Sequence, residues 1–259
     1  MPHDPIASYC AIGDSFSEGM GDERADGTPR GWTDLVAAGI AHAQGEHILY
    51  ANLAIRGRLL GPILEQQLPR ALELQPALLT LNGGGNDIMR PRVSVTVIAQ
   101  RIIDAAVRVR ESGIRPVIVS GGNPTDHLPL GRALQRRGDE LADRVRAGLE
   151  AADVLYVDNW SDARLRPLEN WSIDKLHLNA RGHALAAANV LAALDIAVAA
   201  PPGAPDQAGA MDDLARPRTA EYWRSYVLPW IGRRLTGRSS GDHREPKLPR
   251  LTPFGPADL

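Results

Sequence analysis

Short apolar runs alternate along the chain with longer segments of helical periodicity, and this alternation is the feature that most restricts the fold. Parallel strands need a long crossover between them, so a repeated strand–helix pattern predicts a parallel sheet covered by helices. We expect five strands, at Tyr9–Ile12, Ile48–Leu53, Ala77–Leu81, Pro116–Ser120 and Val154–Val157. We expect helices at Trp32–Ala43, Pro62–Glu73, Val95–Glu111 and Ala133–Ala151, and a last one capped by Asn179 and running to about Ala199.

The chain changes character after Ala200. Residues 201–259 hold nine of the 20 prolines and show little periodicity, which predicts a boundary at residue 200. Within this stretch, residues 216–250 are rich in arginine, and four aromatic residues recur at helical spacing: Tyr222, Trp223, Tyr226 and Trp230. We expect a Pro/Arg-rich extension whose short aromatic helix packs on the core. Contact of that helix with a membrane surface is the alternative.

Composition excludes several classes of function. The 29 basic and 31 acidic residues give a net charge of −2, so the chain lacks the basic excess that binds nucleic acid. The single cysteine, Cys10, rules out an internal disulfide and a multi-cysteine metal site. Neither a signal peptide nor a long apolar span is visible, and we expect a soluble, cytoplasmic protein. The preference for Arg over Lys is typical of a GC-rich bacterial genome.

Two glycine-containing loops follow predicted strands and bring polar side chains to one edge of the sheet. Gly13–Gly21 follows the first strand and contains Ser15, and Leu81–Asp87 follows the third and contains Asn86. In the strand order 2-1-3-4-5, strands one and three flank the crevice where ligands bind, so Ser15 and Asn86 are expected to face each other. Each loop alone is also compatible with an ordinary polar turn.

A third segment supplies a histidine and a carboxylate before the last predicted helix. Asp174 precedes His177 by three residues, a spacing that lets the carboxylate accept from the imidazole and leave its other nitrogen as a base. Read alone, the pair is better explained as a loop residue and a partly buried histidine, and we interpret His183 as structural. Trp160 and Trp171 bracket the approach to His177, where they are expected either to pack or to line a substrate pocket.

The sequence contains no motif typical of a metal-binding or nucleotide-binding site. Asp174, His177 and His183 lack the paired spacing of a zinc-binding helix, and no glycine loop matches a phosphate-binding or dinucleotide-binding fingerprint. We therefore expect neither a metal nor an organic cofactor.

Four blocks taken in order resemble the SGNH hydrolase family, also called GDSL esterases and lipases. They are Gly13–Ser15, Asn52–Gly57, Gly84–Asp87 and Asp174–His177. The resemblance covers residues 6–199 and implies a flavodoxin-like three-layer α/β/α sandwich with a five-stranded parallel sheet. Residues 1–200 would then be the catalytic domain.

The resemblance also implies a function and a role for each residue. Ser15 would be the nucleophile, His177 the base and Asp174 its orienting partner, while the oxyanion hole would comprise Ser15, Gly57 and Asn86. Asp14 joins the two tryptophans as a candidate pocket residue. The implied activity is cofactor-free hydrolysis of short-chain acyl or O-acetyl esters, with a small-molecule ester as the partner. The alternatives are an acyltransferase, a lipase or thioesterase using the same serine, or a non-catalytic binding module.

Overall fold

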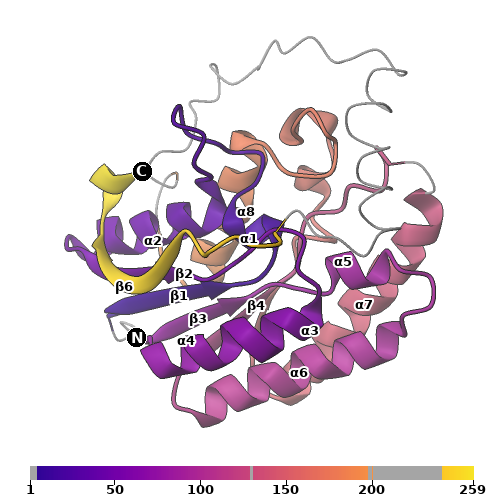
Figure 1. Cartoon of the computed structure of the whole chain (residues 1–259), viewed down its shortest axis with the longest axis horizontal. Coiled ribbons are helices and arrows are strands. Elements are labelled where there is room, and N and C mark those ends of the chain that lie inside the picture. Colours follow the sequence, from indigo (N-terminus) through magenta and orange to yellow (C-terminus); the bar gives the residue numbers. More distant parts are fainter. Residues whose placement is uncertain (1–4, 129–130, 198–199, 201–240) are drawn as a thin grey trace.

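Six strands form a single sheet in the computed structural model, which describes residues 5–128, 131–197, 200 and 241–259 (Figure 1). They are β1 (Ser8–Ile12), β2 (Ile48–Asn52), β3 (Leu78–Leu81), β4 (Arg115–Val119), β5 (Leu155–Val157) and β6 (Leu248–Phe254). Their spatial order is β5-β4-β3-β1-β2-β6, with the first five parallel and β6 antiparallel to β2. The predicted order 2-1-3-4-5 is confirmed, whereas the sixth strand was not expected.

The five parallel strands are largely apolar, as expected for strands with both faces covered. In β1, Tyr9 and Ala11 belong to one hydrophobic core, and Cys10 and Ile12 belong to the other. Successive side chains of a strand point to opposite faces, so a strand buried on both sides reads as a continuous apolar run. The free thiol of Cys10 is buried in this core.

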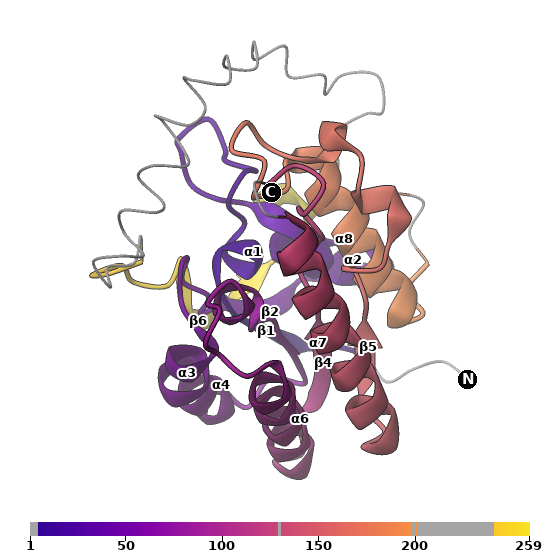
Figure 2. The ribbon, with the colours of Figure 1, turned by 90° about the vertical axis from the view of Figure 1, so that its right-hand side faces the viewer.

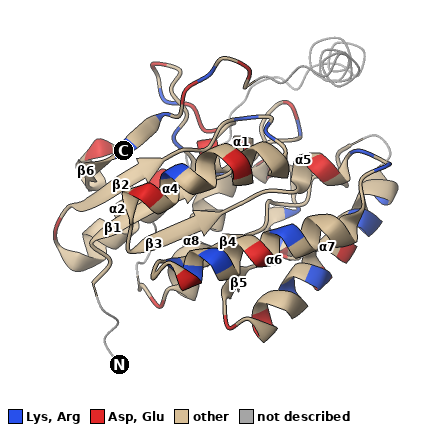
Figure 3. Cartoon of the chain, turned by 60° about the horizontal axis from the view of Figure 1, so that its bottom comes forward, with Lys and Arg blue, Asp and Glu red and all other residues tan. Residues whose placement is uncertain are grey.

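Helices cover the two faces and complete the predicted three-layer arrangement (Figure 2). One face carries α2 (Gly31–Gln44) and α8 (Ala180–Ala193), and the other carries α4 (Leu68–Leu74), α6 (Val95–Glu111) and α7 (Gly131–Ala151). Acidic and basic residues are interspersed along α6 and α7 (Figure 3), as expected for helices with one solvated face.

Two helices differ from the prediction. The expected end of α8 near Ala199 is wrong, because the helix ends at Ala193 and Asp195 follows with a φ of 59°. The helix expected at Pro62–Glu73 is interrupted by a π-helical turn, η1 (Ile63–Gln67), between α3 (Leu60–Pro62) and α4. Such turns insert a residue and re-aim the side chains around it.

The C-terminal segment, defined here as residues 241–259, joins the sheet through the pairing of β6 with β2. Phe254 of β6 is buried, and its ring stands edge-on to Tyr50 of β2 at 5.1 Å between centroids. The aromatic residues expected to form a short helix, from Tyr222 to Trp230, lie outside the described residues, and the boundary at residue 200 stays a prediction. No described helix combines the length and the apolar character needed to cross a bilayer.

Candidate active site

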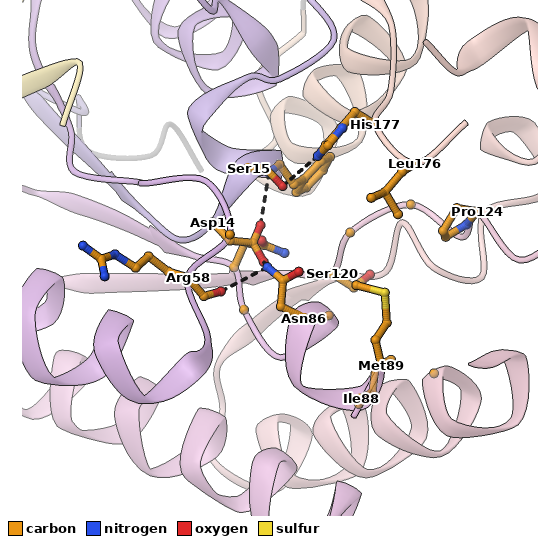
Figure 4. A pocket seen from close by; sticks show the side chains of 18 of the residues that line it. Asp14, Ser15, Arg58, Asn86, Ile88, Met89, Ser120, Pro124, Leu176 and His177 are labelled. Atoms are coloured by element: carbon orange, nitrogen blue, oxygen red, sulfur yellow. Dashed lines mark hydrogen bonds between the residues drawn. The ribbon is translucent and has the colours of Figure 1, made fainter. Parts of the chain in front are cut away.

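Ser15 begins α1 (Ser15–Glu18) directly after β1, at the carboxyl edge of the sheet (Figure 4). The Asp14 carboxylate caps this helix by accepting from the Phe16 N–H at 3.1 Å. Gly13, with a φ of 153°, is held on both sides by Gln67 of the π-helical turn, whose amide accepts from its N–H at 2.8 Å and donates to its C=O at 2.9 Å. The π turn thus fixes the backbone just before the serine.

His177 lies between Ser15 and Asp174. Its Nε2 is 3.0 Å from Ser15 Oγ, across 162 residues of sequence, and its Nδ1 is 2.5 Å from Asp174 Oδ2. The other carboxylate oxygen, Oδ1, accepts from the Ser172 hydroxyl and from the N–H groups of Leu176 and His177. Three donors on one oxygen fix the rotamer of Asp174, and with it the orientation of the imidazole.

The pKa values of Asp174 and His177 are shifted in opposite directions: that of the carboxyl is lowered and that of the imidazole is raised. Burial by itself lowers the pKa of His177, but the charge and hydrogen bond of Asp174 outweigh it, so the pKa is raised above its usual value. Burial raises the pKa of Asp174, yet its contacts with His177 and the backbone donors hold it well below its usual range. The carboxylate therefore stays ionised across the physiological pH range.

Asn86 lies on α5 (Gly85–Ile88), which follows β3, and its side chain points toward Asp14, the residue before Ser15. Its Nδ2 donates to Asp14 Oδ2 at 3.2 Å and to the carbonyl oxygen of Arg58 at 3.0 Å. The neighbouring Asp87 accepts from the Leu60 N–H at 2.9 Å. Both side chains of α5 thereby hold the loop that carries Gly57.

Gly57 has a φ of 73°, a left-handed conformation that favours glycine. In the described part of the chain, neither its N–H nor that of Ser15 donates to a protein acceptor. Two backbone donors therefore remain available at the wall of one cavity.

Asp14 is buried beside the serine and carries an unusual pKa. Burial raises it to about 6, against the lowering effects of the Phe16 N–H and of the His177 charge. Asp14 contributes to the wall of the same cavity as Ser15, and its Oδ2 also accepts from Asn86 Nδ2.

A cavity of about 510 Å³ opens beside Ser15. Ser15, Gly57, Asn86 and His177 all contribute to its wall. Apolar side chains form much of the rest, among them Ile88, Met89, Leu134, Leu141 and Leu176.

Trp160 and Trp171 also line this cavity, but both are nearly buried and held in place. The Trp160 indole N–H donates to Asp139 at 2.8 Å, and that of Trp171 donates to the Leu165 carbonyl at 2.9 Å. Their hydrogen bonds and burial fix both side chains in the cavity wall.

Several contacts at the site were not anticipated. Glu18 accepts from the backbone N–H of Arg56 at 2.5 Å and from its guanidinium at 2.5 and 2.8 Å. Glu18 lies within the first glycine-containing loop, but no local pattern shows that its partner lies 38 residues away. His183 is fully buried, accepts from the Trp32 N–H and lies 3.0 Å from the Met20 carbonyl, in keeping with a structural role.

Residues 11–185 match the GDSL-like lipase/acylhydrolase family. A comparison with curated protein sequences finds no match. Among the described residues, no three His, Cys, Asp or Glu side chains are grouped as a metal-ligand set.

Solved structures share the fold at low sequence identity. Axe2, an acetylxylan esterase from Geobacillus stearothermophilus, is 16% identical, with a TM-score of 0.59 over 72% of this chain and 93% of its own. LAE5, an alpha/beta hydrolase from the metagenome of Lake Arreo, Spain, is 19% identical, with a TM-score of 0.61 over 73% and 95%. TesA is 21% identical, with a TM-score of 0.55 over 72% and 97%.

Proposed function

The chain belongs to the GDSL-like lipase/acylhydrolase family and is a carboxylic ester hydrolase, and from this premise we propose that it cleaves short-chain acyl esters through a covalent intermediate on Ser15. One observation carries the proposal. His177 bridges Ser15 Oγ at 3.0 Å and Asp174 Oδ2 at 2.5 Å, the arrangement that a serine nucleophile, its base and the orienting carboxylate require.

In the first step Ser15 Oγ attacks the ester carbonyl carbon while its proton passes to His177 Nε2. The ionised Asp174 accepts the Nδ1–H, which keeps Nε2 free as the acceptor and stabilises the imidazolium that forms. The imidazolium then gives its proton to the leaving alcohol as the C–O bond breaks, which leaves an acyl group on Ser15.

The negative charge that develops on the carbonyl oxygen needs fixed donors. We assign this role to the N–H groups of Ser15 and Gly57 and to the amide of Asn86. The Asn86 hydrogen that points to Asp14 makes the longer of its two contacts, at 3.2 Å, and this is the hydrogen that an oxyanion would take over.

In the second step water replaces the alcohol. His177 takes a proton from water as its oxygen attacks the acyl carbon, and returns that proton to Ser15 Oγ when the acid leaves. Neither step, as proposed, calls for a metal or an organic cofactor.

The cavity guides the choice of substrate. Its apolar wall beside Ser15 suits a short acyl chain. The fold is similar to that of Axe2, an acetylxylan esterase, and this similarity is compatible with O-acetyl esters as well. We therefore propose a small acyl ester as the substrate.

The test uses p-nitrophenyl acetate, butyrate and octanoate with the full chain. We expect rapid hydrolysis by the parent protein, highest for acetate or butyrate, and loss of it in Ser15→Ala. A matched control is Ser161→Ala, which removes a hydroxyl from an exposed residue outside the cavity wall. Equal rates for the parent and Ser15→Ala would overturn the proposal.

A further inference from the structure

We propose that the C-terminal segment (residues 241–259), together with Glu18, positions the oxyanion hole. Residues 55–58, called the oxyanion loop below, carry Gly57 and are the part of the site that the segment contacts. This inference rests on the proposed function, in which the Gly57 N–H stabilises the oxyanion.

Glu18 joins the nucleophile helix to the oxyanion loop. Its side chain is 7% exposed, and its two oxygens accept from both the backbone and the guanidinium of Arg56. Because the Arg56 N–H is one residue before that of Gly57, the carboxylate restricts the peptide planes that aim the Gly57 N–H. Ser15 and Glu18 share one short helix, so the nucleophile and the oxyanion donor are held by the same element.

The C-terminal segment also contacts this loop. Gly241 is buried so tightly against it that an added Cβ would overlap the carbonyl oxygen of Arg56 and lie 2.6 Å from Ile55 Cγ2. Arg244 brings a second cation to Glu18, with 3.9 Å between Nε and Oε1. The next residue after Gly241, Asp242, contributes to the wall of the cavity itself.

Further along, the segment is anchored to the body of the protein. Lys247 Nζ lies 2.7 Å from Asp34 Oδ1 and donates to the carbonyl oxygens of Pro29 and Arg30. Strand β6 follows at once and pairs with β2. Because Lys247 is fixed by these contacts, Gly241 and Arg244 are held close to the oxyanion loop.

This contribution comes from outside the catalytic core that the family match defines. Residues 11–185 contain the serine, the histidine, the aspartate, Gly57 and Asn86, but not the C-terminal segment. An edge strand that only covered β2 would contribute to stability alone. The contacts of Gly241 and Arg244 with the oxyanion loop and its carboxylate instead couple the segment to transition-state stabilisation.

The experiment compares Glu18→Gln and Gly241→Ala with the parent in the full-length protein. Glu18→Gln keeps the shape of the side chain but removes the charge that binds Arg56, and Gly241→Ala places a methyl group against the Arg56 carbonyl. The matched control is Gly61→Ala, where an added Cβ meets nothing closer than 3.7 Å. Melting temperatures identify a variant that fails to fold, in which case the other variant carries the test.

The first readout is the steady-state kinetics of p-nitrophenyl acetate hydrolysis. Removing one oxyanion donor costs on the order of 10²–10³ in kcat, so displacing one is expected to lower kcat about 10-fold or more. KM should change less than about threefold, because the lost interaction belongs to the transition state. Gly61→Ala should retain the parent kcat.

The second readout is amide hydrogen exchange in peptides that span residues 54–60, which does not depend on activity. Both variants should exchange faster there than the parent and Gly61→Ala. Unchanged kcat and unchanged exchange in Glu18→Gln and Gly241→Ala would overturn the inference. An inactive parent enzyme would instead refute the proposed function, while the exchange data would still decide whether the segment positions the loop.

Discussion

Asp174 Oδ2 lies 2.5 Å from His177 Nδ1, and the second oxygen of the same carboxylate is held by three donors from its own loop. The imidazole therefore faces Ser15 in one orientation. Its pKa is raised by a carboxylate whose rotamer is fixed by these hydrogen bonds. The pH dependence and the effect of substituting Asp174 follow from this contact.

The acid limb of the activity profile should lie above pH 6.5. His177 must be neutral to accept the Ser15 proton, and the Asp174 carboxylate raises its pKa despite the opposing effect of burial. The value of kcat/KM should therefore fall as the pH drops through this raised pKa. Hydrolysis of p-nitrophenyl acetate between pH 5 and 9 measures it, and a midpoint below 6.5 would contradict the assignment.

Asp174→Asn should fold but lose most of its activity. Three donors hold one oxygen of the side chain, so the new amide NH₂ would face His177 Nδ1 and select the wrong tautomer. The analogous change in a serine protease costs about 10⁴ in kcat, and we expect a loss of similar order. Asp153→Asn is the matched control, because its φ of 50° is one that Asn adopts readily. Near-parent turnover in Asp174→Asn would remove Asp174 from the mechanism.

Asn86→Ala should lower kcat on the order of 10²–10³ with a small change in KM, since it removes one oxyanion donor. The fold should survive, because Asp87 still holds the loop through the Leu60 N–H. Steady-state kinetics and a melting curve separate the two effects. A rise in KM at constant kcat would show instead that Asn86 serves ground-state binding.

Asp14→Asn should stabilise the protein at neutral pH. Burial raises the pKa of Asp14 to about 6, above its unfolded value of 3.8, so ionisation opposes folding above pH 6 and this penalty disappears below about pH 4. The neutral amide avoids the penalty and still accepts from the Phe16 N–H, so we expect about 1–3 kcal/mol of added stability at pH 7. Denaturant unfolding at pH 7 and pH 4 tests it. Lower stability of the variant at pH 7 would show that the contact with Asn86 outweighs the burial penalty.

Phe254→Ala tests the attachment of the C-terminal segment to the sheet. The ring is 7% exposed and packs edge-on against Tyr50, and truncating a buried Phe costs about 3–5 kcal/mol. Val97→Ala is the control, because Val97 is 55% exposed and its truncation should change stability by less than about 0.5 kcal/mol. Equal unfolding midpoints for Phe254→Ala and the parent would mean that β6 contributes little to the fold.

The errors of the sequence-based prediction have identifiable causes. Strand β6 was missed because Pro249 and Pro253 interrupt any strand pattern, and only an edge position tolerates them. The end of α8 was placed too late because the run of alanines and other apolar residues continues past Ala193, although the backbone leaves the helix there. Helix ends depend on capping and packing that propensity alone does not reveal.

Apolar periodicity by itself predicted the five parallel strands, because periodicity is a local property of the sequence. Their order followed from the arrangement common to such sheets, and Ser15, Asn86, Asp174 and His177 were proposed as site residues from four short motifs that resemble a known family. Only the tertiary structure decided how Glu18 meets Arg56 and how Gly241 and Arg244 close on the same loop. These contacts join segments far apart in the chain, and nothing in the local pattern of charge or hydrophobicity specifies such partners. Their geometry arises from packing the finished sheet, where a buried carboxylate must find a cation and donors close by.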